Sequence, residues 1–273
     1  MPSQWSLLKP NLKKLLPPRR PDSHKGNFGR ALIIAGSSGM AGAAILASRG
    51  ALRVGAGLTY LALPKDLVNV VNSATPEVIT LSFDNLKRIL PDAVGIGPGL
   101  GVSATTRELI KYVLEIDCPV IADADALNVL AANLSLLSHL RRCQLILTPH
   151  PGEMARLLRQ DVASIQHDRR ASAKKAAQMF NAIVVLKGHR TIVADPTGQI
   201  YVNGTGNPGM AKGGTGDVLT GIMTGLAAQK IKPWSAACAA TYLHGLAGDL
   251  AAKEKGQVSM IASDIIEQIP NAI

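Results

Sequence analysis

The chain has 273 residues, a formal net charge of +10, 47% hydrophobic residues and only 18% charged residues. This balance excludes an intrinsically disordered chain and suits one large α/β domain, or two smaller domains, with buried cores. Three cysteines, Cys118, Cys143 and Cys238, lie far apart with no C-x-x-C motif, which excludes a disulfide framework or a zinc finger and indicates a reducing, cytoplasmic compartment.

Most of the positive charge belongs to a basic N-terminal arm. Residues 1–30 carry six of the ten net positive charges. The chain has nine aromatic residues in all, too few for a base-stacking surface, so nucleic acid is not an expected partner. No stretch suits a membrane span or a secretory signal, so no membrane partner is expected. Two interpretations of residues 5–8 stay open: an amphipathic surface segment, or part of an arm that packs on the domain. The packed arm is favoured.

Short apolar runs alternate with longer amphipathic runs along the chain. They predict strands at 31–36, 58–63, 93–97, 119–123, 145–150, 183–188, 191–195 and 199–203. They predict helices at 41–54, 105–116, 126–131, 153–159, 163–180, 215–229, 235–253 and 262–269. This alternation indicates βαβ units in a layered α/β fold, with a central, mostly parallel sheet flanked by helices. The turn at 195–198 predicts a local antiparallel hairpin, and the absence of a linker favours a single domain over residues 1–273.

Polar residues and glycines follow several of the predicted strands. Since ligands bind outside the carboxyl ends of strands in open parallel sheets, these residues are expected to meet along one edge. The strongest feature is Gly-Gly-Thr-Gly-Asp at residues 213–217, before a predicted helix. Glycines there let an anion approach the free N–H groups of the first helical turn. Asp217 fits two interpretations, a helix-stabilising acid or a base beside a phosphate-like group.

Two other nucleotide-binding patterns do not account for the glycines. No Walker A motif occurs in the sequence. The G-x-G-x-x-G at residues 204–209 is interrupted by Pro208 and follows a predicted hairpin strand, so it fits a Rossmann fingerprint poorly. We interpret it as a flexible approach to the loop at 213–217. Gly50, Gly55 and Gly57 are interpreted as sites of close helix packing.

The sequence resembles the ribokinase-like proteins, and among them the ADP/ATP-dependent NAD(P)H-hydrate dehydratases. The most specific block is NPGMAKGGTGDVLTG at 207–221, and the other blocks occur in the family's order. These are HKGNFGR at 24–30, GSSGMAGAA at 36–44, GPGLG at 97–101, DADALN at 123–128, TPHPGEM at 148–154 and KGHRT at 187–191. The resemblance implies a ribokinase-like fold over roughly residue 15 to the end.

The resemblance implies repair of damaged nicotinamide cofactors. A phosphoryl group passes from ADP or ATP to the ring hydroxyl of the S-epimer of hydrated NADH or NADPH. Phosphate then leaves and the ring double bond is restored. Mg²⁺ is implied as a cofactor held by phosphate oxygens and water, with no protein metal ligands. The resemblance also implies a homo-oligomer, with a tetramer expected, and a separate NAD(P)H-hydrate epimerase as functional partner.

The resemblance also assigns residues to three roles. Asp217 would be the base on the hydroxyl, and Gly214, Thr215 and Gly216 would form the anion hole for the phosphoryl group. Contacts to the hydrated substrate would come from Ala43, Ala44, Gly101, Asn128, His150 and Asp217. Contacts to the AMP part of the nucleotide would come from Lys187, Gly188, His189, Arg190, Thr191 and Gly216. Lys212 would add positive charge beside the phosphates.

Simpler interpretations of single residues stay open. His150 could shape a turn between two prolines, Glu153 could be a helix N-terminal charge rather than a ligand of metal-bound water, and Asp123 or Asp125 could cap a helix. Lys187 ends a buried strand, so a phosphate or carboxylate partner is expected. At the level of function, two alternatives remain: a ribokinase-like kinase of a small vitamin-precursor alcohol, and a catalytically silent nucleotide-binding protein.

Overall fold

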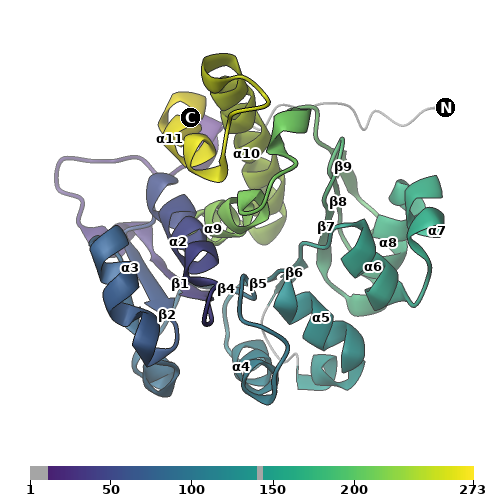
Figure 1. Ribbon diagram of the computed structural model, residues 1–273, viewed down its shortest axis with the longest axis horizontal. Helices are drawn as coiled ribbons and strands as arrows, with labels where there is room; N and C mark the ends of the chain where they lie inside the picture. Colours follow the sequence, from purple (N-terminus) through teal and green to yellow (C-terminus); the bar gives the residue numbers. More distant parts are fainter. Residues whose placement is uncertain (1–11, 140–143) are drawn as a thin grey trace.

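The computed structural model describes residues 12–139 and 144–273. Residues 1–11 of the basic arm lie outside the described residues, and with them the open question of a surface segment at 5–8. Cys143 also lies outside them. A nine-stranded sheet runs through the molecule in the order β3-β2-β1-β4-β5-β6-β7-β8-β9 (Figure 1). Its strands are β1 Arg30–Ile34, β2 Leu58–Ala62, β3 Ile79–Leu81, β4 Ala93–Ile96, β5 Val120–Ala122, β6 Leu145–Leu147, β7 Ile183–Leu186, β8 Ile192–Ala194 and β9 Ile200–Val202.

The first seven strands pair in parallel, and β8 and β9 pair antiparallel at one end. The predicted hairpin is therefore confirmed, and it is joined to β7 by a second antiparallel pairing. All four residues of β4 and all three of β5 are buried. Such strands need cover on both faces, which explains why their sequences are continuously apolar rather than alternating.

Helices cover both faces of the sheet. One face carries α2 Ala41–Arg53, α3 Val68–Ala74, α9 Thr215–Ala228, α10 Pro233–Lys255 and α11 Ala262–Ala272. The other carries α4 Ala104–Leu114, α5 Asp125–Ala132, α6 Pro151–Leu158, α7 Val162–His167 and α8 Arg169–Phe180. Successive residues of β1 show the division: Leu32 and Ile34 enter one core, and Ala31 and Ile33 point to the other face. The fold class predicted from the sequence, a layered α/β fold, is confirmed.

Each strand and helix predicted from the sequence is present, with two corrections. The helix predicted at 163–180 is two helices, because Asp168 leaves helical geometry (φ −137°) and its carboxylate caps α8 at the Ala171 N–H. The sequence missed α1 (Leu12–Leu15), α3 and β3. All three are short, and β3 is the edge strand beside β2, so none of them produces a long apolar run.

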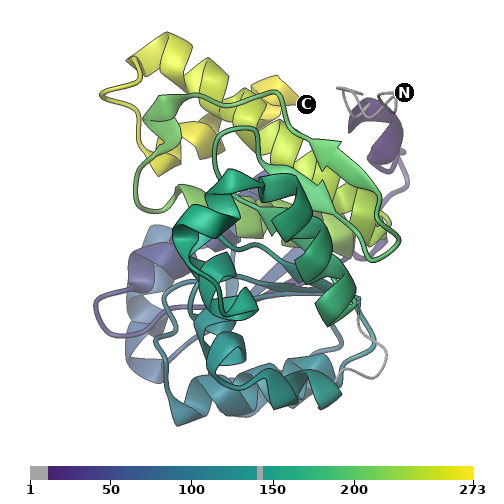
Figure 2. The ribbon, with the colours of Figure 1, turned by 90° about the vertical axis from the view of Figure 1, so that its right-hand side faces the viewer.

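The described part of the N-terminal arm packs on the domain. Leu12, in α1 Leu12–Leu15, is buried in the same core as α10 and α11, and Figure 2 shows α1 on their side of the molecule. Arg19 donates a hydrogen bond to the Gly55 carbonyl at 2.5 Å and lies 3.5 Å from the centre of the Phe28 ring. The prediction that Gly55 and Gly57 pack between helices is therefore wrong, because both contact the arm: a Cβ on Gly57 would lie 1.8 Å from the Lys25 carbonyl oxygen. Within the described residues, no helix is long and apolar enough to cross a membrane.

Helices α2 and α9 pack closely through glycines. A Cβ built on Gly50 of α2 would lie 2.7 Å from the Val218 carbonyl oxygen, and one on Gly221 of α9 would lie 1.9 Å from that of Ala47. No side chain fits at those distances, so the two backbones themselves are in contact. This contact fixes α9 against α2, and with it the turn that begins α9.

Candidate active site

The turn at residues 213–217 forms the N-terminus of α9. Gly214 adopts φ +89°, and a Cβ there would lie 2.5 Å from a methyl group of Leu46, so only glycine suits this position. The Thr215 hydroxyl is turned back onto the carbonyl oxygens of Met210 and Lys212, at 3.0 Å each. The N–H groups of residues 215–217 have no partner within the helix. The turn thus offers backbone donors, not the threonine hydroxyl, to an anion.

Asp217 occupies the first turn of α9 and is half-buried. Burial, followed by the nearby charge of Asp123, raises the pKa of Asp217 to about 7, and Lys187 opposes the rise. A carboxyl group with that pKa changes protonation near neutral pH, so it can accept a proton from a hydroxyl far better than an ordinary aspartate. The carboxyl group of Asp217 can therefore exchange a proton near neutral pH at the start of α9.

Lys187 has the buried partner expected from the sequence. Its ammonium lies 2.5 Å from Oδ1 of Asp123, and the Thr220 hydroxyl donates to Oδ2 of the same carboxylate at 2.7 Å. Burial disfavours the charged form of Lys187, but the Asp123 and Glu153 carboxylates outweigh it and raise the pKa of Lys187. The lysine therefore keeps its charge inside the site.

Glu153 and His150 form a reciprocal cap at the start of α6. His150 Nδ1 accepts from the N–H groups of Gly152 and Glu153, and the His150 N–H donates to Glu153 Oε2 at 2.7 Å. The simpler interpretation of both residues, as a turn and a helix N-terminal charge, is thus present in the structure. Burial, opposed most by Lys187, still raises the pKa of Glu153 to about 7.

Asp125 links two of the predicted substrate residues. Its Oδ2 accepts from the Gly101 N–H at 2.8 Å, and its Oδ1 lies 3.4 Å from Nδ2 of Asn128. The interpretation of Asp123 or Asp125 as a helix cap is wrong, because the N-cap of α5 is Ala124 and makes no side-chain cap. Ala124 has φ +49°, a strained value for a residue with a Cβ. Asp123 on one side of it turns inward to Lys187, while Asp125 on the other reaches Gly101.

The two predicted alanines lie at the start of α2. Ala43 is 7% exposed and packs 3.1 Å from the Cβ position of Gly99, and Ala44 is fully buried beneath Gly36. Gly101, in contrast, has φ +74° and open space where a side chain would be. A ligand therefore has direct access at Gly101, whereas Ala44 shapes the surface from underneath.

The loop at 187–191 is held from below by Arg169, a residue that the sequence reasoning missed. The Arg169 guanidinium donates to the carbonyl oxygens of Leu186 and Lys187 at 3.1 Å each, and also to that of His189. A side chain on Gly188, which has φ +134°, would come within 3.0 Å of the guanidinium. Thr191 closes the loop through a bond from its hydroxyl to the Gly188 carbonyl. Arg169 stands 17 to 20 residues before these partners, so no local motif marks it.

Replacing Arg169 by Met is expected to loosen this loop. Hydrogen bonds from a charged donor contribute about 1.5–3 kcal/mol, so amide hydrogen exchange at residues 187–191 should become about 10- to 100-fold faster. Arg170→Met is the matched control, since Arg170 is the next residue of α8 and is exposed. Hydrogen exchange followed by mass spectrometry measures both. Equal exchange in the two variants would show that Arg169 does not hold the loop.

The other predicted residues of the loop lie at the surface. His189 and Arg190 are exposed and line a pocket of about 330 Å³ together with residues 166–170, Ile192 and Val202. Lys187 points away from this pocket, toward Asp123. Lys212 is likewise not directed at the turn, because its ammonium donates to the carbonyl oxygens of Val258 and Met260. Among these residues, only Lys187 therefore brings its charge to the centre of the site.

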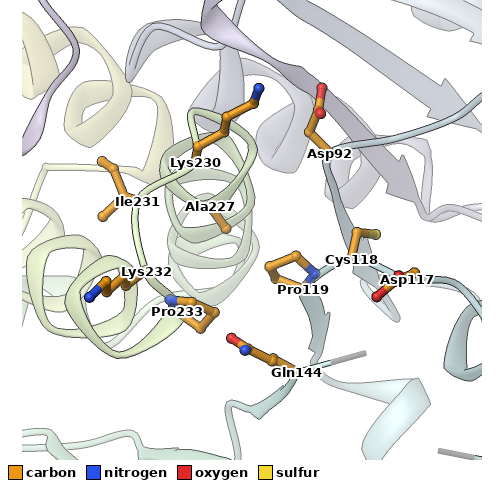
Figure 3. Close-up of a pocket in the computed structure, with 10 residues that line it drawn as sticks. All are labelled: Asp92, Asp117, Cys118, Pro119, Gln144, Ala227, Lys230, Ile231, Lys232 and Pro233. Atoms are coloured by element: carbon orange, nitrogen blue, oxygen red, sulfur yellow. The ribbon is translucent and has the colours of Figure 1, made fainter. Parts of the chain in front are cut away.

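Another pocket, of about 340 Å³, lies at the opposite edge of the sheet (Figure 3). Asp92, Pro119 and Gln144 stand just before β4, β5 and β6, so this pocket is at the amino ends of those strands. The chemistry-bearing side chains predicted from the sequence are at the carboxyl ends. The structure thus separates this pocket from the candidate active site.

Comparisons with known proteins identify the family of this chain. The family model described as NAD(P)H-hydrate dehydratase matches residues 31–271. A bifunctional NAD(P)H-hydrate repair enzyme of Moorella thermoacetica is 45% identical over 271 residues, which cover 93% of this chain and 51% of the relative. An ADP-dependent (S)-NAD(P)H-hydrate dehydratase of Neisseria meningitidis is 42% identical, covering 90% of this chain and 86% of the relative. The chain spans about half the length of the bifunctional relatives that it matches.

Solved structures indicate the same family and fold. The ADP/ATP-dependent NAD(P)H-hydrate dehydratase of Bacillus subtilis, co-crystallised with ATP and Mg²⁺, superposes with a TM-score of 0.86 at 34% identity, covering 96% of this chain and 94% of that one. A ribokinase-like superfamily protein of Enterococcus faecalis gives 0.84 at 30% identity, covering 97% and 93%. The ribokinase-like fold expected from the sequence is confirmed. The chain belongs to the NAD(P)H-hydrate dehydratase family.

Proposed function

We propose that this protein uses ADP or ATP to dehydrate the S-epimer of hydrated NADH or NADPH, returning the intact reduced cofactor. The observation that carries the proposal is Asp217, whose pKa is raised to about 7 by burial and which stands in the first turn of α9. We propose that it is the base and that the turn of Gly214, Thr215 and Gly216 forms the anion hole beside it. The names of relatives that share 42% and 36% identity and most of their length with this chain support the same reaction.

The proposed chemistry has two steps. The ring hydroxyl gives its proton to Asp217, and its oxygen forms a bond to the terminal phosphorus of the nucleotide. The bond from that phosphorus to the bridging oxygen breaks, and its electron pair leaves with AMP or ADP. The carbon–oxygen bond of the phosphorylated ring then breaks with its electrons on phosphate. Loss of a proton from the neighbouring ring carbon restores the double bond. Phosphorylation converts a poor leaving group into a good one, and the protein supplies position and charge.

The remaining site residues divide between two ligands in this proposal. Gly101, Asn128 and His150 would contact the hydrated cofactor, with Ala43 and Ala44 forming the surface beside it. Lys187, Gly188, His189, Arg190, Thr191 and Gly216 would bind the nucleotide. The grouping of Gly101 with Asn128 through Asp125, and of the loop residues through Arg169, supports this division.

We propose that Mg²⁺ enters the site bound to the phosphates of the nucleotide. Within residues 12–139 and 144–273, no cluster of three or more His, Cys, Asp or Glu side chains is arranged to hold a metal ion. Both oxygens of Asp123 have partners, and so does Oε2 of Glu153. We propose that phosphate oxygens and water hold the cation.

We also propose the compartment, the oligomeric state, the functional partner and the domain organisation of the enzyme. Cys118 and Cys238 are both buried, and the wide spacing of the cysteines along the sequence supports a reducing cytoplasm. A homotetramer and a functional partnership with an NAD(P)H-hydrate epimerase are proposed from the family resemblance, and relatives named as bifunctional repair enzymes support the partnership. The strands of the described residues form one continuous sheet that the cores on its two faces share, which supports treating the chain as one domain.

Incubating the protein with hydrated NADH and either ADP or ATP tests the proposal. Absorbance of the reduced nicotinamide should return only when nucleotide is present, with release of one phosphate per cofactor repaired. Boiled protein and nucleotide-free reactions are the controls. No return with either donor, together with ATP-dependent phosphorylation of a vitamin-precursor alcohol, would replace this proposal by the kinase alternative.

A further inference from the structure

The Asp123 carboxylate is buried and bonds two side chains from other elements. It stands directly after β5, is 1% exposed, and each of its oxygens has one partner: the Lys187 ammonium on Oδ1 and the Thr220 hydroxyl on Oδ2. Thr220 is itself fully buried on α9. Burying a carboxylate and an ammonium together is costly unless both are well bonded. The arrangement therefore fixes where the lysine ammonium lies.

The ammonium lies next to the anion-binding turn. A carbon built in the Cβ position of Gly216 would be 3.6 Å from Lys187 Nζ and 3.9 Å from Asp123 Oδ2. Glu153 Oε2 is 3.9 Å from the same ammonium. A lysine ammonium has three N–H donors, of which Asp123 takes one. The others are available beside the backbone donors of the turn.

We propose that Lys187 binds the phosphoryl group that is transferred, rather than the AMP part, and that Asp123 and Thr220 are positioning residues that hold it there. This inference rests on the proposed function. During transfer, the hydroxyl proton goes to Asp217, the new oxygen–phosphorus bond forms, and the old one breaks with its electrons on the departing nucleotide. The Lys187 charge stabilises the negative charge on the phosphoryl oxygens throughout that exchange.

Binding of ADP and AMP separates this role from the AMP contact expected from the sequence, without any turnover. AMP lacks the terminal phosphoryl group. Lys187→Met should weaken ADP binding about 30-fold and AMP binding less than about 3-fold, as expected for one lost charged contact. Lys187→Arg, which keeps the charge, should recover part of the ADP affinity. Equal weakening of ADP and AMP, measured by calorimetry, would overturn the assignment.

A pair of threonines on α9 tests the positioning role. Thr220→Val removes the hydroxyl that holds Asp123, and we expect kcat to fall about 10-fold with AMP affinity unchanged. Thr224→Val is the matched control: Thr224 is one turn further on, equally buried, and its hydroxyl donates only to the Thr220 carbonyl. It should leave kcat unchanged. A loss of kcat as large in Thr224→Val would mean that the threonines only support the fold.

A double-mutant cycle tests whether Asp123 acts through Lys187. Asp123→Asn alone leaves a buried ammonium with a weaker partner, whereas Asp123→Asn with Lys187→Met removes both charges and is less disruptive to folding. The double variant should be no slower than Lys187→Met alone. Additive losses would overturn the positioning role. The inference and the proposed function can fail separately. If Lys187→Met lost ADP binding selectively but the wild type repaired no hydrated cofactor, the proposed function would be wrong and this inference would stand.

Discussion

Replacing Asp217 by Asn is expected to lower kcat for dehydration about 1,000-fold, while ADP still binds. Asparagine has the same shape but cannot accept the hydroxyl proton, and a general base contributes about 10²- to 10⁴-fold. Loss of a negative charge beside the phosphates should leave ADP affinity unchanged or improve it. Return of nicotinamide absorbance measures kcat, and calorimetry measures ADP binding. Near-normal turnover in this variant would remove Asp217 from the chemistry.

Asp264 provides the matched control. It occupies the same first-turn position in α11, where its carboxylate accepts the Ile261 N–H at 2.7 Å. Asp264→Asn should reduce helix stability by about 1 kcal/mol and leave kcat unchanged. If Asp217 were only a helix-stabilising acid, the two variants would behave alike, each losing stability and neither losing turnover.

The pH dependence of kcat/KM should follow the pKa of Asp217. Burial first, and then Asp123, raises that pKa to about 7; Asp125 adds to the rise, while Lys187 opposes it. A base works when deprotonated, so kcat/KM should rise about tenfold per pH unit below pH 7 and level off above it. A flat profile between pH 5.5 and 8 would contradict the assigned role.

The same pKa predicts an effect on stability with a definite sign. A carboxyl group whose pKa is raised by folding binds its proton more tightly in the folded state. Its contribution is fully present below the unfolded pKa of about 4 and is lost as pH rises through about 7. Asp217→Asn should therefore unfold at a higher temperature than the wild type at pH 8. A higher unfolding temperature for Asp217→Asn would show that this acid lowers the stability of the folded protein, as active-site residues often do.

The sequence predicted the sheet and the edge at which the site lies, because apolar runs and the residues after them are local signals. Asp217 and Lys187 could be predicted as candidate site residues because each stands at the end of a predicted strand or the start of a predicted helix. The interactions that position their charges could not be predicted from the sequence. Asp123 is 64 residues from Lys187 and 97 from Thr220, and Arg169 meets its loop through backbone carbonyls that any residue could supply. Tertiary packing creates these contacts, and no spacing rule records them.

The contact between α2 and α9 also fixes the position of the turn at residues 213–217. The glycines in the sequence indicate close packing, but they do not show which helices meet. Gly221 is expected to be among the positions least tolerant of substitution, because a Cβ there would lie 1.9 Å from the Ala47 carbonyl oxygen, which is backbone and cannot rotate away. Gly221→Ala should destabilise the protein by about 3 kcal/mol. That corresponds to a fall in Tm of about 6–12 °C, measurable by calorimetry.

Gly42→Ala is the control on the same helix pair. Gly42 is an exposed residue in the first turn of α2, and nothing lies within 4 Å of its Cβ position. Alanine favours a helix over glycine by up to about 1 kcal/mol, so Tm should stay the same or rise slightly. The contrast separates the steric contact from helix propensity, since both substitutions add one methyl group to a helical glycine. If Gly221→Ala kept the wild-type Tm, α9 would be free to shift, and the glycine contact would not be what holds Asp217 and the anion-binding turn in place.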